Sequence, residues 1–497
     1  MNATRTVFLA TVFLACSVYS SQAPAQTEPQ GGQPAFGAKP SVPDLDEQVV
    51  YQRAFEAVVW AQPAVGLYGF RRAFIELGIR DNEINAMSKP ATARHELLTA
   101  NNTTPYIAAT ANLKDGPVVL EVPPESRKGV LFGQVVDAWQ ETIAAVGPSG
   151  LDKGKGGKYL FLPPNYSRAA PKGYLVIRSS NYRIAFAFRS IKLPGMTDSD
   201  AHAYALKLKM YPLAQAASPA PTRFVDTWAK PLHTLAFYDM RYFQDLHAAI
   251  TDEPVRPRDK AMMGMLATLG IEAGKPFTPP ARYKAAMERA VVDAYFYMQD
   301  RFYKVQSANL FYPDRHWSYF LLSDADDSPS FDLPAGLFYT QRSDMYHPGT
   351  FFPPRIPRLS QISEWVKAGK APATAYLVSI ADRDGRPLEG GRLYRLRVPA
   401  DMPVKQFWSL IVYDYATWAF IYNPMDRVGL STYDTAGMKK NADGSVDIYF
   451  GPKAPEGFES NWIPTQGKKP MPLMRIYGGD DRFWSRSFTL PDVERVE

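Results

Sequence analysis

The sequence has 497 residues, of which 46% are hydrophobic and 21% are charged, and its formal net charge is +6. This length exceeds one ordinary core, so we expect a globular chain of two or three domains. The small net charge argues against a nucleic-acid-binding protein, and the single cysteine, Cys16, excludes a disulfide framework.

The first 25 residues have the pattern of an export signal. Arg5 supplies a positive charge, Val7–Ala15 forms an apolar core, and Ala23-Pro24-Ala25 is a small-x-small cleavage site. We therefore predict a periplasmic or secreted protein after cleavage near Ala25. The alternative is a lipoprotein acylated on Cys16, although the preceding residues fit a lipoprotein box poorly. Since no later run of about 18 apolar residues is present, we expect no transmembrane segment in the mature chain.

Residues 26–42 are rich in Pro, Gly and Gln and predict a flexible tether. Asp44 or Asp46 can cap a helix that follows directly. The rest of the segment 43–192 contains short β-branched and aromatic runs divided by Gly and Pro, which is typical of a sandwich or barrel. We expect an N-terminal β domain with a leading helix.

Residues 193–304 have helical spacing and are expected to connect or brace two β domains. We predict helices at Asp200–Tyr211, Asp239–Ile250, Asp259–Leu269 and Ala281–Tyr303. The last of these carries one apolar stripe, which indicates a packing face rather than a cofactor site. The stripe consists of Met287, Val291, Ala294, Met298 and Phe302.

Residues 305–497 return to a strand pattern and predict a C-terminal β-sandwich domain. Within them Gln406–Asn423 reads QFWSLIVYDYATWAFIYN, whose first part fits a strand of a sandwich core. Asp414 lies in this run, where a carboxylate is costly to bury unless it is paired or hydrogen-bonded. The whole chain is predicted to be α+β and β-rich, with two β-sandwich or jelly-roll-like domains joined by a helical segment.

Short motifs occur in a fixed order in both β regions. The N-terminal motifs are NNTTPY, PVVLEVPP, GVLFGQVVDAW and GKYLFLPPNY, and the C-terminal ones include QFWSLIVYD, KNADGSVDIYFG, ESNWIPT and MRIYG. By these motifs, residues from about Ala54 to Arg189 resemble the domain of unknown function 1254. Residues from about Thr374 to Pro491 resemble the domain of unknown function 1214. The resemblance implies an exported or envelope-associated protein without an assigned activity.

The sequence departs from the family pattern at two places. The turn that usually reads Asn-x-Asp-Thr is Asn102-Thr103-Thr104 here, so no role for a carboxylate in that turn carries over. The usual Gly-Tyr-Pro of the first helix reads Ala61-Gln62-Pro63.

Two motif acids, Asp137 and Asp414, are the candidate catalytic residues, one in each β domain. Two carboxylates could catalyse cleavage of a glycosidic bond at a separation of roughly 5–10 Å. The alternative is that each is a structural acid, paired with an arginine such as Arg178, Arg189 or Arg475 or bonded to turn amides.

Polar and aromatic residues of the same motifs are candidates for binding a substrate. Trp408, together with the pairs Asn461-Trp462 and Arg475/Tyr477, could form a sugar-stacking platform with amide and guanidinium donors. The alternative is aromatic packing with a bonded indole N–H. The full set of candidates is Asn101, Thr103, Arg178, Trp408, Asn461, Trp462, Arg475 and Tyr477.

No histidine pattern predicts a zinc site, and His347 is interpreted as a packing or loop residue. Asp324, Asp326 and Asp327 could bind Ca²⁺ through oxygen ligands, but they lack the spacing of an EF-hand. A solvated acidic loop is the alternative interpretation, and no other cofactor is expected.

Three functional hypotheses remain, and they leave open whether the protein is an enzyme. The first is an envelope protein that binds or cleaves a carbohydrate in an interdomain groove, which is an inference from fold to function. The second is a non-catalytic scaffold or partner-binding protein. The third is a hydrolase or isomerase of a small aromatic or lipid-like molecule, which an apolar cavity would indicate.

Overall fold

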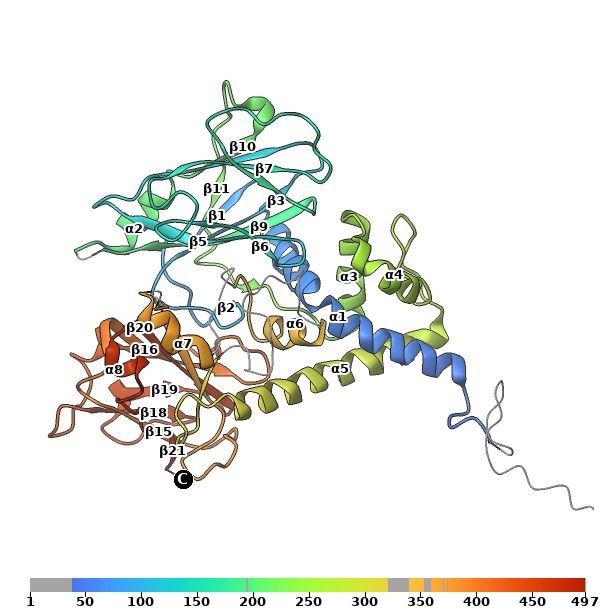
Figure 1. The fold of residues 1–497 in the computed structure, drawn as a ribbon. Helices are drawn as coiled ribbons and strands as arrows, with labels where there is room; N and C mark the ends of the chain where they lie inside the picture. The colour runs from blue at the N-terminus through green and yellow to red at the C-terminus, as the bar shows by residue number, and fades with distance from the viewer. Residues whose placement is uncertain are drawn as a thin grey trace, which may run out of the picture. The chain divides into compact units, whose positions relative to one another are not determined.

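The computed structural model describes residues 38–193, 195–320, 339–352, 359–369, 371–372 and 374–496. The fold is α+β, with several sheets and with helices between them, as predicted (Figure 1). By its internal contacts the chain divides into Met1–Gln48 and Val49–Glu497. In the first unit, the Asp44 carboxylate accepts a hydrogen bond from the amide of Glu47 (2.9 Å) and caps the helix that begins there.

Two sheets that share one buried core form the N-terminal half of the second unit. Their strand orders are β11-β1-β3-β9-β5-β6 and β10-β4-β7-β8. Ile107 and Phe186 of the first sheet meet Leu120 and Phe161 of the second, so the two layers make a sandwich. The strands are β1 (Ile84–Ala86), β3 (Tyr106–Asn112), β4 (Val118–Val122), β5 (Val130–Asp137), β6 (Thr142–Val146), β7 (Gly157–Leu162), β8 (Leu175–Arg178), β9 (Arg183–Ile191), β10 (Lys209–Pro212) and β11 (Phe224–Val225). A separate parallel pair joins β2 (His95–Glu96) to β12 (Leu232–His233).

The C-terminal half contains a second sandwich. Its sheets have the orders β13-β14-β20-β16-β17 and β19-β18-β15-β21. Leu410 and Met474 of the first sheet share a buried core with Leu396 and Ile448 of the second. The strands are β13 (Trp317–Tyr319), β14 (Thr374–Ser379), β15 (Tyr394–Val398), β16 (Val404–Asp414), β17 (Gly429–Ser431), β18 (Val446–Gly451), β19 (Trp462–Pro464), β20 (Pro470–Gly479) and β21 (Glu494–Arg495).

Helices α1 (Leu45–Glu76), α3 (Met240–Asp252), α4 (Lys260–Ala267) and α5 (Ala281–Ala308) supply most of another buried core. The predicted stripe of α5 is fully buried, which confirms a packing face. The other α-helices among the described residues are α2 (Asp198–Ala205), α6 (Tyr339–Tyr346), α7 (Ile362–Lys367) and α8 (Asp481–Trp484). Short 3₁₀ turns are η1 (Leu213–Gln215), η2 (Pro257–Asp259), η3 (Leu359–Gln361), η4 (Thr432–Asp434) and η5 (Glu459–Asn461).

The helix predicted at Asp200–Tyr211 is shorter than expected. Thr197 caps α2 in a capping box, but the helix ends at Ala205 and the chain then forms β10. Strand β10 pairs antiparallel with β4, and Met210 and Tyr211 enter different buried clusters. Sheet pairing therefore overrides the local helical pattern at these residues.

The outer face of the β14-β20-β16 sheet packs against the segment between β1 and β3. Tyr413 and Leu473 on this face share a buried cluster with Met87 and Ala93 of that segment. As a result, a loop of the N-terminal half lies against the C-terminal sheet, and the candidate site is built around this contact.

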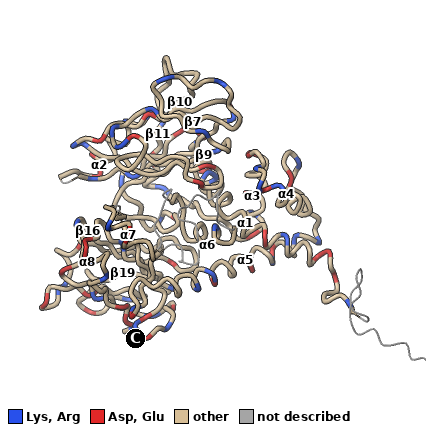
Figure 2. Tube along the Cα trace, viewed as in Figure 1, with Lys and Arg blue, Asp and Glu red and all other residues tan. Residues whose placement is uncertain are grey.

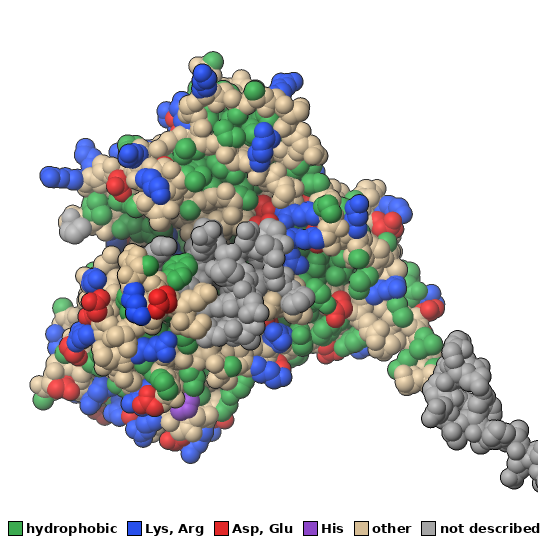
Figure 3. Space-filling view, viewed as in Figure 1, with side chains coloured by type: hydrophobic (Ala, Val, Ile, Leu, Met, Phe, Trp, Pro, Cys, Tyr) green, Lys and Arg blue, Asp and Glu red, His purple; other side chains and the backbone are tan. Residues whose placement is uncertain are grey.

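None of the helices in the described part of the chain is long and apolar enough to cross a membrane. Lys and Arg are interspersed with Asp and Glu along the trace in Figure 2. On the face shown in Figure 3 the basic side chains are spread over both sandwiches.

Candidate functional site

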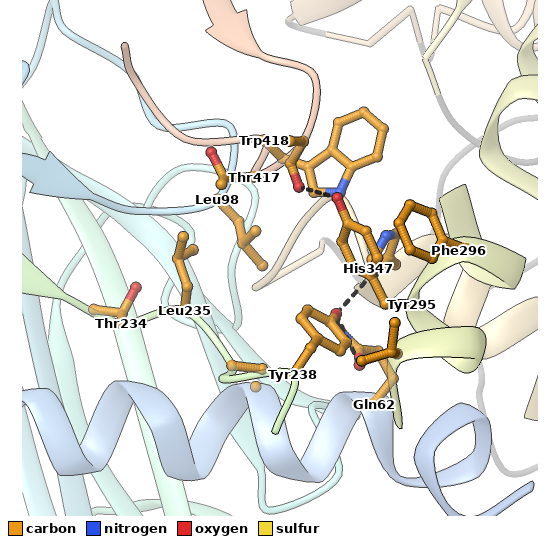
Figure 4. Close-up of a pocket in the computed structure, with 14 residues that line it drawn as sticks. Gln62, Leu98, Thr234, Leu235, Tyr238, Tyr295, Phe296, His347, Thr417 and Trp418 are labelled. Carbon is orange, nitrogen blue, oxygen red and sulfur yellow. Dashed lines mark hydrogen bonds between the residues drawn. The ribbon is translucent and has the colours of Figure 1, made fainter. Parts of the chain in front are cut away.

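An aromatic cavity of about 390 Å³ lies among α1, α5 and four connecting segments (Figure 4). This volume is in the range of sites for small molecules. Among the described residues, no Asp, Glu, Lys or Arg lines the cavity. Its lining consists of Gln62, Gly66, Leu98, Thr234, Leu235, Ala236, Tyr238, Val292, Tyr295, Phe296, His347, Ala416, Thr417 and Trp418.

Three aromatic rings surround the imidazole of His347 in the wall of this aromatic cavity. The ring of Trp418 lies 5.7 Å from it, that of Tyr295 5.8 Å and that of Tyr238 5.9 Å, each close to an edge-to-face arrangement. Such contacts favour a rigid, preformed wall. Phe296 and Val292 of α5 also line the cavity but are 63% and 44% exposed, so this part of the lining reaches solvent.

Gln62 of α1 organises the polar groups of the cavity. Its Nε2 donates to the phenol oxygen of Tyr238 (3.2 Å) and to the carbonyl oxygen of Tyr346 (3.4 Å), while its Oε1 accepts from Tyr242 (3.0 Å). The hydroxyl of Tyr238 also lies 2.9 Å from Nδ1 of His347. With Gln62 in this orientation, Tyr238 can donate its own hydrogen to Nδ1, which places the imidazole hydrogen on Nε2.

Two nitrogens of lining side chains, Nε2 of His347 and Nε1 of Trp418, have no hydrogen-bond partner among the described residues. Both side chains are buried, with 2% and 1% of their surface exposed. A buried donor without a partner costs about 1–3 kcal/mol, which a hydrogen-bond acceptor on a ligand would relieve. Burial lowers the pKa of His347 to about 3, so the imidazole is neutral at physiological pH.

The loop that carries Trp418 is shaped by Asp414, one of the two predicted catalytic acids. Its Oδ1 accepts from the amide of Ala416 (3.0 Å), and its carbonyl oxygen accepts from the amide of Trp418 (2.8 Å). Trp418 adopts a positive φ of 59°, which is unfavourable for a bulky residue and depends on this tight turn. Asp414 also lies 3.5 Å from Nζ of Lys468. It therefore holds the cavity wall without lining the cavity.

Asp137, the other predicted catalytic acid, ends β5 and is fully buried. Its Oδ1 accepts from the amides of Trp139 (2.9 Å) and Glu141 (3.0 Å), and its Oδ2 is ion-paired with Arg256. Burial raises the pKa of Asp137 to about 6, against the opposing effect of Arg256.

The two acids lie in different sandwiches, and neither lines the aromatic cavity. Each carboxylate bonds to backbone amides of its own turn, and the described residues give the two acids no common partner. These contacts match the alternative in which each acid is structural, with Arg256 and Lys468 as partners in place of the arginines considered from the sequence.

The structure brings together four of the candidate binding residues: Asn101, Thr103, Arg475 and Tyr477. The Nδ2 of Asn101 donates to the phenol oxygen of Tyr477 (2.9 Å), and its Oδ1 accepts from the amide and the hydroxyl of Thr103 (both 2.6 Å). Arg475 donates to the carbonyl oxygens of Thr99 (2.5 Å) and Ala100 (3.2 Å). The NNTTPY turn is thus anchored directly on β20.

The other four candidates lie elsewhere. Trp408 is buried in the core of the C-terminal sandwich, and the indole N–H of Trp462 donates to the carbonyl oxygen of Gly451 (3.1 Å). The buried amide of Asn461 bridges backbone groups of Lys439 and Asp447. Arg178 is exposed and donates to the carbonyl oxygen of Tyr166 (3.0 Å). Trp408 and Trp462 therefore match the packing alternative.

Sequence reasoning did not single out the residues that line the aromatic cavity. His347 was interpreted as a packing residue, and Trp418 belonged to the aromatic run of the C-terminal domain. Their common signal is the aromatic surroundings of a lone histidine, which does not distinguish a cavity wall from a core. The described residues contain no cluster of three His, Cys, Asp or Glu suited to a metal ion. The calcium candidates Asp324, Asp326 and Asp327 lie outside the described residues.

Comparison with known proteins identifies two regions of the chain. The family described as "Protein of unknown function (DUF1254)" matches residues 82–212, which contain β1–β10, and the family described as "Protein of unknown function (DUF1214)" matches residues 373–481, which contain β14–β20. No curated protein matches the chain.

Two solved structures are similar to the chain. The VPA0106 protein from Vibrio parahaemolyticus is 17% identical, with a TM-score of 0.52 over 91% of this chain and 100% of its own. An uncharacterised protein from Burkholderia cenocepacia is 12% identical, with a TM-score of 0.39 over 90% of this chain and 94% of its own. The first likeness supports the fold alone. The chain therefore carries an N-terminal DUF1254 domain and a C-terminal DUF1214 domain, two families described as proteins of unknown function.

Proposed function

We propose that the protein binds a small, mainly apolar molecule that carries an aromatic ring and a hydrogen-bond acceptor. The observation that supports this proposal is the aromatic cavity, whose lining includes two buried nitrogens without partners on His347 and Trp418. Transfer of apolar surface from water into such a cavity is favourable by about 25 cal/mol per Å². The two nitrogens would orient the acceptor group of the ligand.

Because His347 is neutral and a weak base, binding is favoured over acid–base catalysis. An efficient general base has a pKa near the working pH, whereas burial lowers the pKa of His347 to about 3. The described lining residues also include no carboxylate, and Asp137 and Asp414 both lie outside the cavity. Of the three hypotheses from the sequence, the one with a small aromatic ligand agrees best with the cavity. We therefore propose that the protein binds such a ligand, and we propose no reaction on it.

The carbohydrate hypothesis stays a prediction, and the structure adds nothing in its favour. Sugars need many polar partners as well as a stacking ring, and the cavity offers few polar groups. A scaffold would present an exposed apolar patch, and Phe296 with Val292 is the exposed apolar pair at the cavity. The carbohydrate hypothesis is therefore included in the test as an alternative outcome.

The test is thermal unfolding of the purified protein with a panel of small molecules. The panel holds phenols, heteroaromatic carbonyl compounds, acyl esters and oligosaccharides. A ligand present at about 100 times its dissociation constant stabilises a protein by roughly 2.7 kcal/mol. We expect an increase in melting temperature with an aromatic acceptor. An increase with oligosaccharides alone would contradict the proposal and favour the carbohydrate hypothesis.

A matched pair of variants assigns binding to the cavity. Ala236→Phe fills the cavity, whereas Ala216→Phe adds the same ring at a half-buried alanine that does not line it. We expect the first variant to lose the stabilisation by the ligand and the second to keep it. If Ala236→Phe binds as tightly as the unmodified protein, the ligand occupies another place and the cavity proposal is wrong.

Export remains a proposal, because the predicted signal lies outside the described residues. We expect the protein in the periplasm or the medium, with a mature N-terminus near Gln26. N-terminal sequencing of the protein from fractionated cells measures this directly. Acylation of Cys16 would instead retain it on a membrane.

A further inference from the structure

Two arginines and four tyrosines form a polar cluster away from the aromatic cavity. Four of them lie on β14, β16 and β20 of the C-terminal sandwich, and the other two lie on β3 and β9 of the N-terminal sandwich. We call it the Arg–Tyr cluster. The guanidinium carbon of Arg475 lies 4.6 Å from the ring centroid of Tyr376, and that of Arg189 lies 5.7 Å from that of Tyr106. The members are Tyr106, Arg189, Tyr376, Tyr413, Arg475 and Tyr477.

The positive charges of this cluster have no carboxylate partner in the part of the chain that the structure describes. Among the described residues neither the buried Arg475 nor the partly buried Arg189 forms an ion pair, whereas the buried Arg183 pairs with Asp81 and Asp252. Arg475 is 1% exposed and directs Nη2 only to uncharged oxygens, those of Thr99, Ala100 and Tyr413. A buried charge is costly unless it is paired. A bound anion would therefore stabilise two neighbouring guanidiniums that have no acid beside them.

Hydrogen-bond donors of the cluster also remain unused. The Nε of Arg475 is buried and has no partner among the described residues. The adjacent turn carries one more buried donor without a partner there, the Oγ1 hydroxyl of Thr104. Guanidinium and hydroxyl groups are the donors that oxyanions accept. Tyr106, Arg189 and Tyr376 are only partly buried, which leaves a route from solvent.

We propose that the Arg–Tyr cluster binds an oxyanion, a carboxylate or a phosphate group, between the guanidiniums of Arg189 and Arg475. The anion supplies the missing negative charge and accepts hydrogen bonds from the guanidiniums, with Thr104 as a further donor. This site is separate from the aromatic cavity, and its test does not depend on the function proposed there.

Tyr376, Tyr413 and Tyr477 do not by themselves neutralise the cluster at physiological pH. Burial would raise the pKa of the Tyr376 phenol, but Arg189 and Arg475 outweigh burial and lower the pKa to about 8. Tyr376 is therefore mostly protonated at pH 7. The pKa values of Tyr413 and Tyr477 are raised, mainly by burial, so these phenols stay neutral as well.

The experiment compares sodium phosphate, sulfate and acetate with sodium chloride at equal ionic strength. Isothermal titration and thermal unfolding of the full-length protein are the measurements. We expect saturable binding of at least one oxyanion. Acetate alone would identify a carboxylate site, phosphate and sulfate alone a site for tetrahedral anions, and either result supports the proposal. No saturable binding by any of the three would overturn it.

Variants separate this site from the general stabilisation of proteins by phosphate and sulfate. Arg189→Gln removes one guanidinium of the cluster, and Arg178→Gln removes an exposed guanidinium on β8 as the matched control. We expect Arg189→Gln to weaken oxyanion binding at least tenfold and Arg178→Gln to leave it unchanged. Arg475→Gln is a second variant, although it also removes the bonds to the carbonyl oxygens of Thr99 and Ala100, just before the NNTTPY turn. Equal affinities in Arg189→Gln and the unmodified protein would contradict the proposal, whether or not Arg475→Gln folds.

Discussion

The amide of Thr99 donates a hydrogen bond of 2.7 Å to the carbonyl oxygen of Trp418. This contact ties a loop of the N-terminal half to the wall of the aromatic cavity. Leu98, the preceding residue, lines the same cavity, while the carbonyl oxygen of Thr99 accepts from Arg475 of the Arg–Tyr cluster. One short segment, Leu98–Asn101, therefore contributes to both proposed sites.

Asp414 is expected to act on the cavity through its loop. Asp414→Asn keeps an oxygen that can accept from the amide of Ala416, whereas Asp414→Ala leaves this amide without its partner. We expect Asp414→Ala to lose about 1–2 kcal/mol of unfolding free energy and the ligand affinity of the cavity, and Asp414→Asn to lose less than half of that. Urea denaturation and ligand titration measure both. If an activity is found and Asp414→Asn abolishes it while the fold stays intact, a structural role alone does not explain the function of Asp414.

Removal of the Asp137 carboxylate should destabilise the protein strongly. Asp137→Asn leaves Arg256 buried with Glu141 as its remaining acid. Loss of one member of a buried ion pair lowers the free energy of unfolding by about 3–5 kcal/mol. Because Glu141 still pairs with Arg256, we expect a loss near the lower value. Urea denaturation measures it. Asp384→Asn, which removes an exposed partner of Arg386, is the control and should change stability by less than about 0.5 kcal/mol. A loss below about 1 kcal/mol in Asp137→Asn would contradict the assigned role.

Tyr238 is expected to support His347. Tyr238→Phe removes the hydroxyl that lies 2.9 Å from Nδ1 and 3.2 Å from Nε2 of Gln62, so both groups lose a partner. We expect a loss of about 1–3 kcal/mol in unfolding free energy, measured in urea. Tyr433→Phe, at a tyrosine that is 70% exposed, should have little effect. Equal stabilities of the two variants would show that the hydroxyl of Tyr238 is not needed.

His347 should make the protein less stable in acid. Its pKa is lowered in the folded state to about 3, so the unfolded chain binds a proton first as the pH falls. The stabilising contribution of neutral His347 is present above pH 6.5, the ordinary pKa of histidine, and is lost as the pH falls from there toward 3. His347→Asn should therefore show a shallower loss of stability over this range than the unmodified protein. His247→Asn is the control variant, and identical slopes for His347→Asn and the unmodified protein would contradict the prediction.

Tyr376 should ionise near pH 8, as measured by the absorbance of tyrosinate in a pH titration. The charged groups that face it are Arg189 and Arg475, and the phenols of Tyr106, Tyr413 and Tyr477 belong to the same cluster. Because its pKa is lowered from the ordinary value of 10 to about 8, Tyr376 adds stability as the pH rises through this interval, and the contribution is complete above pH 10. Tyr376→Phe should remove the early titration, and Arg189→Gln should move it to higher pH. An unchanged titration in Tyr376→Phe would assign it to another residue.

Periodicity and turn residues were sufficient for much of the fold. The α+β class, the helix α5 with its buried stripe and the cap at Asp44 follow from local patterns, because side-chain direction within an element depends on neighbours in sequence. The order of the DUF1254 and DUF1214 regions came instead from the resemblance of short sequence motifs to these families. Strand β10 does not follow from local patterns, since its pairing with β4 joins segments about 90 residues apart.

The sites were decided by tertiary structure. A lone histidine, an aromatic run and a helical glutamine carry no common signal, yet packing places Gln62, His347 and Trp418 around one cavity. Conversely, Asp137 and Asp414 stand out in sequence as acids in apolar strands, and only their contacts show that each bonds to the amides of its own turn. The sequence by itself indicated the apolar face of regular elements such as α5, whose stripe is buried as predicted. Which residues face one another was set by contacts between distant segments, whose geometry no local pattern encodes.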